Sequence, residues 1–138
     1  MIRLLIVTYN DFGSHIIDAA AHILGSYPEF LKTQRVGYDD TPEKLEVEIQ
    51  QKLDQLKNTE GIIILTDVFG ATHTNIALKF VSKGNISLVS GLNLPMLLRI
   101  MNYRHLDLAS LVDKAVKGGQ EGIKNSCMSA PECNNGPL

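Results

Sequence analysis

The sequence has no tryptophan, only two cysteines among 138 residues and no long hydrophobic run. No stretch approaches the roughly 18 apolar residues of a membrane-spanning helix, and the apolar start of the chain is too short for a signal peptide with its cleavage site. Cys127 and Cys133 lie near the end, at no zinc-binding spacing, and a single pair makes no disulfide framework. We therefore expect a protein of the reducing cytoplasm with two incidental thiols and no metal site.

The sequence also lacks an excess of charge of either sign. Its net charge is -2 and its isoelectric point is near 6.0, so no basic face indicates nucleic acid or an anionic membrane surface. Hydrophobic residues make up 44% and charged residues 20%, which is typical of a globular chain and excludes disorder throughout. The length suits one domain with a substantial core.

Short apolar segments alternate with helical patterns through residues 1–124. We expect strands at 3–8, 32–38, 61–66 and 86–90, and helices at 12–24, from 41 onward, at 76–81, 96–101 and 106–117. The second strand is the most polar, which favours a sheet edge. This order predicts an α/β fold with a parallel sheet and right-handed crossovers. The remainder, 125–138, is small, polar and proline-bearing, and we expect it to be disordered.

Two polar, glycine-bearing turns follow predicted strands: VTYNDFG at 7–13 and LTDVFGATHTN at 65–75. Open α/β sheets place their ligands in such loops, at the carboxyl ends of strands. The backbone of Gly70, Ala71 and Thr72 can offer N–H groups to a phosphoryl group. Asp67 can accept a hydrogen bond from a ring nitrogen and thereby fix the tautomer of a neighbouring imidazole.

The segments LLIVT with DFG, GIIILTDVFGAT with Asn75, and VSGLNLPMLLRIMNYR occur in an order and spacing that resemble one family. This family is the mannose/fructose-type enzyme IIA component of the bacterial phosphoenolpyruvate-dependent sugar phosphotransferase system. The resemblance spans roughly residues 1–124. It implies a flavodoxin-like open parallel sheet of order 2-1-3-4 with helices on both faces, in which the first and third strands are neighbours and their loops share one pocket.

The resemblance further implies a phosphoryl relay in sugar uptake. Family members carry the phosphoryl group on a histidine of the first loop, receive it from the phosphocarrier HPr and pass it to a IIB domain, and an aspartate in the second loop, here Asp67, orients the imidazole. They are cytoplasmic homodimers that meet the membrane only through the permease complex, and no cofactor is implied. The pocket lining carried over to this chain is Thr8, Asn10, Phe69, Gly70, Ala71, Thr72 and Asn93.

This chain departs from the family at the decisive position, because Tyr9 stands where the family has its phosphohistidine. Imidazole is nucleophilic near pH 7, whereas a phenol is mostly protonated there. A phosphate ester of a phenol is also a much poorer phosphoryl donor than a phosphohistidine. Asn10, in place of the family's glycine, still tolerates a left-handed turn.

His73, where the family usually has proline, is the candidate for a substitute acceptor. In one hypothesis its ring enters the pocket from the side opposite to Tyr9. The interpretation we favour on sequence grounds is a solvent-facing loop residue at a helix start. A third possibility is that Tyr9 fills the pocket, with its hydroxyl bonded to Asp67.

Three functions stay open, in this order. The first is a phosphotransferase component that works through an unusual acceptor. The second is a catalytically silent relative that binds HPr or a IIB partner. The third is a receiver-like domain phosphorylated on Asp67, since Asn10 and Asp11 follow the first strand, although the lysine-proline turn of a receiver is missing.

Overall fold

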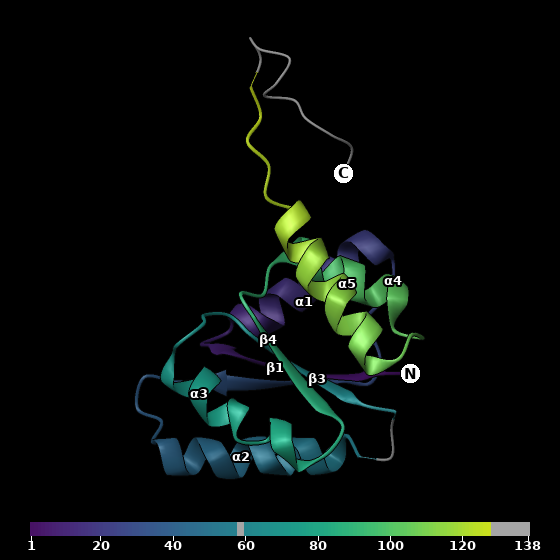
Figure 1. The fold of residues 1–138 in the computed structure, drawn as a ribbon. Helices are drawn as coiled ribbons and strands as arrows, with labels where there is room; N and C mark the ends of the chain where they lie inside the picture. Colours follow the sequence, from purple (N-terminus) through teal and green to yellow (C-terminus); the bar gives the residue numbers. More distant parts are fainter. Residues whose placement is uncertain (58–59, 128–138) are drawn as a thin grey trace.

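The fold is one layer of four parallel strands between two layers of helices (Figure 1). The computed structural model describes residues 1–57 and 60–127 and has the strand order β2-β1-β3-β4. The strands are β1 (Arg3–Tyr9), β2 (Leu31–Val36), β3 (Ile62–Thr66) and β4 (Ile86–Ser90); the helices are α1 (Phe12–Leu24), α2 (Pro42–Gln55), α3 (Thr72–Leu78), α4 (Leu94–Tyr103) and α5 (Leu108–Glu121), with a 3-10 turn, η1 (Val81–Lys83). The α/β, flavodoxin-like fold expected from the sequence is confirmed.

The central strands β1 and β3 are almost wholly buried because helices cover both faces of the sheet. Leu4 and Ile6 of β1 pack in the cluster formed with α1, α4 and α5, whereas Leu5 and Val7 pack in the cluster formed with α2 and α3. Strands β2 and β4 form the edges, and the prediction of an edge position for the polar second strand is confirmed.

Helix α2 begins where the sequence predicts. The Thr41 hydroxyl accepts a hydrogen bond from the Lys44 N–H at 3.2 Å, and Pro42 takes the first helical position, where a missing N–H costs nothing. The helix buries one apolar stripe against the sheet: Leu45, Ile49 and Leu53.

Arg104, just after α4, ties together segments that are distant in sequence. Its guanidinium donates to the carbonyl of Ile2 at 2.9 and 2.7 Å, to that of Glu29 at 2.6 Å and to that of Phe30 at 2.9 Å. Burial lowers the pKa of Arg104 to about 10. Phe30 has a left-handed φ of 53°, which is unusual for a bulky residue, and the bond to its carbonyl helps to hold it.

Several elements differ in extent from the sequence prediction, and strand β2 ends at Val36 instead of 38. Helix α3 begins at Thr72, whereas the sequence predicts a start at 76, because the polar residues of its first turn are typical of a loop. Helix α4 begins at Leu94, two residues before its predicted start, and α5 continues to Glu121, beyond its predicted end. Gly118 allows α5 to approach α4 closely, since a Cβ there would lie 2.6 Å from the Cβ of Arg99.

The end of the chain leaves the body of the fold at 123–127 (Figure 1). Most of the predicted tail, 128–138 with Cys133, lies outside the described residues. Cys127 is disulfide-bonded, so the expectation of an incidental thiol is wrong there; sequence spacing alone does not say whether a cysteine pair closes.

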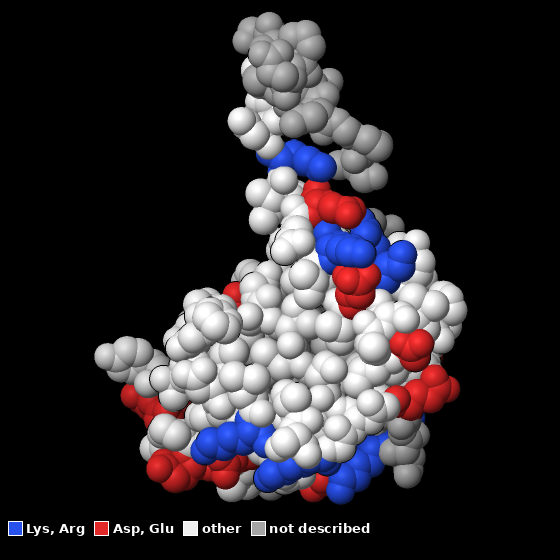
Figure 2. All heavy atoms as spheres, viewed as in Figure 1, with Lys and Arg blue, Asp and Glu red and all other residues white. Residues whose placement is uncertain are grey.

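The outer surface mixes charges of both signs. Figure 2 shows charged side chains over α2 and over α5, with mostly uncharged residues between them on this face. Among the described residues, no helix is long and apolar enough to cross a membrane.

Candidate functional site

The centre of the site is the Asp67 carboxylate, directly after β3. Its Oδ2 accepts from the Tyr9 N–H at 2.8 Å, and its Oδ1 accepts from the Val68 N–H at 2.9 Å. Because β1 and β3 are adjacent and in register, with Val7 opposite Thr66, both turns begin at the same edge of the sheet. Asp67 therefore joins the loop after β3 to Tyr9 at the end of β1, 58 positions earlier in the sequence.

His73 lies against this carboxylate. Its Nε2 is 2.6 Å from Asp67 Oδ1, and the side chain is 1% exposed. The favoured sequence interpretation of a solvent-facing loop residue is wrong, because α3 already begins at Thr72 and its first turn directs the ring inward. A neutral ring that donates from Nε2 to the carboxylate keeps its lone pair at Nδ1.

The rings of Tyr9 and His73 lie against each other in a T-shaped arrangement. The ring centroids of Tyr9 and His73 are 4.6 Å apart at an interplanar angle of 77°. Tyr9 is 48% exposed, and its backbone N–H, not its hydroxyl, binds Asp67. The possibility of a pocket plugged by a hydroxyl bonded to the carboxylate is therefore wrong.

The first turn is held by side chains on both flanks. The buried Thr8 hydroxyl accepts from the Gly13 N–H at 2.8 Å, so Thr8 fixes the start of α1 and does not face the cavity beside His73. Asn10 has φ 49°, the left-handed conformation that asparagine tolerates, and its Oδ1 accepts from Arg35 at 3.4 Å.

The second loop, 68–71, is mostly exposed. Phe69 is 83% exposed, Gly70 adopts φ 84°, and Ala71 forms the N-cap of α3. The buried Thr74 hydroxyl donates to the Val68 carbonyl at 2.7 Å and holds the loop on the helix. No sequence pattern distinguishes Thr74 from its polar neighbours, so its role could not be predicted.

Asn93 lies apart from the Asp67–His73 pair. Its side chain accepts from the Met96 N–H at 2.9 Å and donates to the Gly119 carbonyl at 3.1 Å, so it caps α4 and holds α5. It lines a separate hollow of about 180 Å³ next to α5.

His15, His22 and His105 are exposed on other elements. Within the described residues, no group of three or more His, Cys, Asp or Glu side chains is arranged to hold a metal ion.

Comparison with known proteins gives consistent matches. The family model "PTS system fructose IIA component" matches residues 3–116. The mannose-specific EIIAB component of Escherichia coli K12 is 28% identical over 131 residues, which cover 89% of this chain but 39% of that protein. The fructose-specific EIIA component of Bacillus subtilis is 24% identical over 126 residues, covering 90% of this chain and 86% of that protein.

Solved structures match the fold as well. The phosphotransferase system component EIIA from Streptococcus agalactiae superposes with a TM-score of 0.79 at 27% identity, covering 89% of this chain and 95% of that one. The mannose/sorbose-specific IIA subunit from Enterococcus faecalis gives a TM-score of 0.81 at 16% identity over 94% and 96% of the two chains, a likeness of fold alone. Since the family model covers most of the sequence, the chain belongs to the fructose-type IIA component family of the phosphotransferase system.

Proposed function

We propose that this protein is a phosphoryl-transfer component that accepts a phosphoryl group from HPr on His73 and passes it to a IIB domain. The observation that carries the proposal is the 2.6 Å contact between His73 Nε2 and Asp67 Oδ1. It places an imidazole, oriented by a carboxylate, at the edge of the sheet where the resemblance locates the family's phosphohistidine.

The chemistry favours His73 over Tyr9 as the acceptor. With Nε2–H donated to Asp67, the lone pair at Nδ1 is the nucleophile, and the carboxylate stabilises the positive charge that the ring gains as the N–P bond forms. The P–N bond of the donor phosphohistidine breaks in the same step. Tyr9 lacks such a bond between its hydroxyl and Asp67, and an ester at its oxygen would be a poor donor to IIB.

Access to His73 requires movement of Tyr9. The imidazole is 1% exposed, so a protein donor reaches it only after the half-exposed phenol ring turns outward. Rotation of a partly exposed side chain is fast compared with enzyme turnover.

The burial of His73 also favours a second candidate function. A silent relative that binds HPr or IIB without accepting a phosphoryl group would keep the loop framework around Asp67 and leave the imidazole covered. Phosphorylation of Asp67 itself has less support, because both of its oxygens already accept hydrogen bonds.

Incubation with phosphoenolpyruvate, enzyme I and HPr carrying labelled phosphate separates these functions. We expect an acid-labile, base-stable label on the wild-type protein, as a phosphohistidine gives, and its loss in His73→Ala. His15→Ala, at an exposed histidine of α1, is the matched control and should keep the label. A wild-type chain that binds HPr but takes no label supports the silent relative; an acid-labile, base-labile label retained in His73→Ala supports Asp67.

The family and its resemblance supply the rest of the proposal. The protein acts in the cytoplasm as a homodimer and meets the membrane only through the permease complex. It uses no metal and no organic cofactor. Because the chain spans 39% of the length of the Escherichia coli relative, the activities of that longer protein do not transfer as a whole.

A further inference from the structure

A cavity of about 250 Å³ opens between the end of α2 and the 3-10 turn η1. It stands at the amino ends of β3 and β4, because Ile62 and Ile86, the first residues of these strands, line it. Asp67 follows the carboxyl end of β3, so the whole length of this strand separates the cavity from the Asp67–His73 pair. The cavity is therefore distinct from the candidate phosphoryl-transfer site.

The floor of the cavity is apolar and belongs to the core cluster that the sheet forms with α2 and α3. Leu53, Ile62 and Phe80 line the cavity and are each no more than 5% exposed, and Ile86 packs against the same cluster. The Phe80 ring adds a flat aromatic surface to this floor. The apolar part of a ligand would gain by covering such a surface, because it removes apolar area from water.

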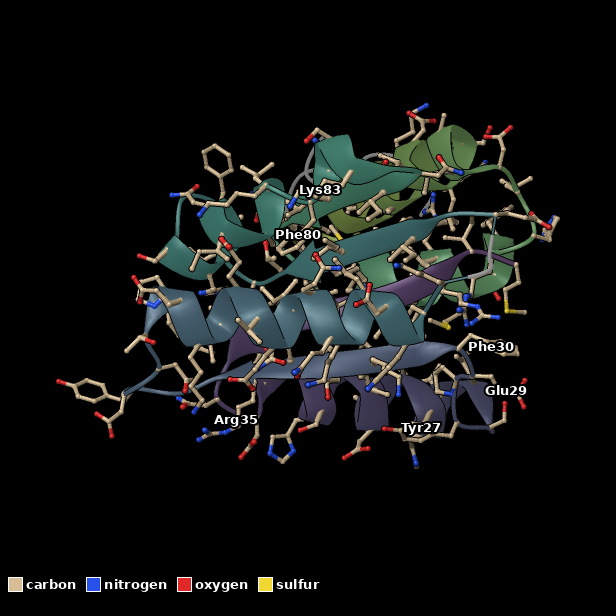
Figure 3. All side chains as sticks on the ribbon, turned by 90° about the horizontal axis from the view of Figure 1, so that it is seen from below. Tyr27, Glu29, Phe30, Arg35, Phe80 and Lys83 are labelled. Carbon is tan, nitrogen blue, oxygen red and sulfur yellow. The ribbon has the colours of Figure 1, made fainter. Side chains whose placement is uncertain are left out.

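Two lysines stand at the mouth, and no acidic side chain is among the described residues that line the cavity. Lys57 forms an exposed ion pair with Asp54 at 3.0 Å. Lys83 lies over the Phe80 ring, with its Nζ 5.0 Å from the ring centroid (Figure 3). This cation–π contact uses only the face of the ring, so the N–H donors of the ammonium group can still bind an anion.

The carboxylates around the cavity are already balanced by cations other than Lys83. Three of them are paired: Asp54 with Lys57 at 3.0 Å, Glu46 with Lys79 at 2.8 Å and Glu60 with the amino terminus at 3.6 Å. Arg3 donates to the Lys57 carbonyl at 3.3 Å and adds a further positive charge beside the cavity. Within the part of the chain that the structure describes, Lys83 forms no ion pair. The surroundings of the mouth therefore carry an excess of positive charge.

This combination discriminates between classes of ligand. A cation would meet lysines and no lining carboxylate, whereas a small inorganic anion would leave the apolar floor in water. An uncharged apolar molecule would make no use of Lys83. The volume lies just below the roughly 300–1,000 Å³ of sites for drug-sized ligands, which favours a smaller molecule.

We propose that this cavity binds a small monocarboxylate with an apolar body, such as a branched-chain or aromatic acid. The body would cover Leu53 and Phe80, and the carboxylate would accept hydrogen bonds from Lys83 at the mouth. The inference goes beyond phosphoryl transfer and requires neither His73 nor a partner protein.

The test is an NMR titration of the labelled protein with benzoate and isovalerate near pH 7, where both acids are ionised. Benzamide and isovaleramide, their neutral amides, test the role of the charge, and acetate tests the role of the apolar body. We expect at least one of the two acids to shift the amide signals of Ile62, Lys83 and Asn85 with saturation. Since an exposed ion pair is weak, the matching amide should bind at least roughly threefold more weakly, and acetate should do so too. The inference is overturned if neither acid gives a saturable shift, or if the amides or acetate bind as tightly.

Variants in the wall locate the binding. Gln50→Trp fills the cavity from α2 and should abolish the shifts, while Gln51→Trp, at the exposed neighbour outside the wall, is the matched control. Lys83→Gln should weaken binding roughly threefold, and Lys79→Gln, at a lysine that does not line the cavity, should leave it unchanged. Wild-type affinity in Gln50→Trp, with its fold confirmed by the amide spectrum, would refute the inference. Equal effects of the two lysine substitutions, both at exposed residues, would refute it as well.

Discussion

Single residues at the site have two tasks at once. Asp67 orients the His73 ring and also accepts the N–H groups of Tyr9 and Val68, so one carboxylate sets both the chemistry and the shape of the two loops. Tyr9 binds this carboxylate through its backbone, which leaves its side chain replaceable without loss of the contact. Substitutions at position 9 can therefore test whether the pocket accepts a phosphoryl group.

We predict that Tyr9→His restores acceptance of the phosphoryl group in a chain that also carries His73→Ala. An imidazole at position 9 starts from a backbone whose N–H lies 2.8 Å from Asp67 Oδ2, where the resemblance places the family's phosphohistidine. Labelling through HPr should rise from background toward one phosphoryl group per chain. Tyr9→Phe in the same background is the control and should stay unlabelled. A folded double variant that takes no label would mean that the surface for HPr is lost, which the single His73→Ala variant cannot reveal.

Whole elements position the site through their ends. Strands β1 and β3 deliver the two turns, and α3 delivers His73 because it starts at Thr72. The loop after β4 takes another course: Asn93 closes the start of α4 and reaches α5, on the opposite face from α3 (Figure 1).

We predict that Asn93→Ala lowers the free energy of unfolding by about 1–2 kcal/mol, since the N-cap acceptor of α4 and the bond to Gly119 are both lost. Urea denaturation followed by circular dichroism measures this change. Asn102→Ala, at an exposed position of the same helix, should change the unfolding free energy by no more than about 0.5 kcal/mol. Equal effects of the two substitutions would contradict the capping role.

At the scale of the whole molecule, Arg104 links the segments that lie at the amino ends of the strands. One guanidinium satisfies carbonyls before β1 and in the α1–β2 connection, at the end of the sheet opposite to the candidate site. Figure 3 places Glu29 and Phe30 together at that end. The arrangement separates a rigid end from the end that bears exposed loops.

We predict that Arg104→Met lowers the free energy of unfolding by about 3 kcal/mol or more, because three backbone carbonyls lose a charged donor at about 1–3 kcal/mol each. Arg35→Met, at an arginine whose side chain is 58% exposed, is the control and should cost less than about 1 kcal/mol. Chemical denaturation of both variants gives the comparison, and a loss below 1 kcal/mol in Arg104→Met would show that water replaces the guanidinium.

The sequence by itself determined the order of strands and helices, the polar edge strand, the start of α2 at Thr41 and the family. These features depend on local periodicity, capping residues and glycine turns, and each of these signals comes from residues that are close together in the sequence. Tertiary structure decided where the side chains of the site point. The backbone contact of Tyr9 with Asp67 and the bond from Asn93 to Gly119 join residues 58 and 26 positions apart, and no local pattern encodes such bonds. The His73 ring turns inward because α3 begins at Thr72 and packs its first turn against the sheet edge, where the ring meets Asp67, only six positions away.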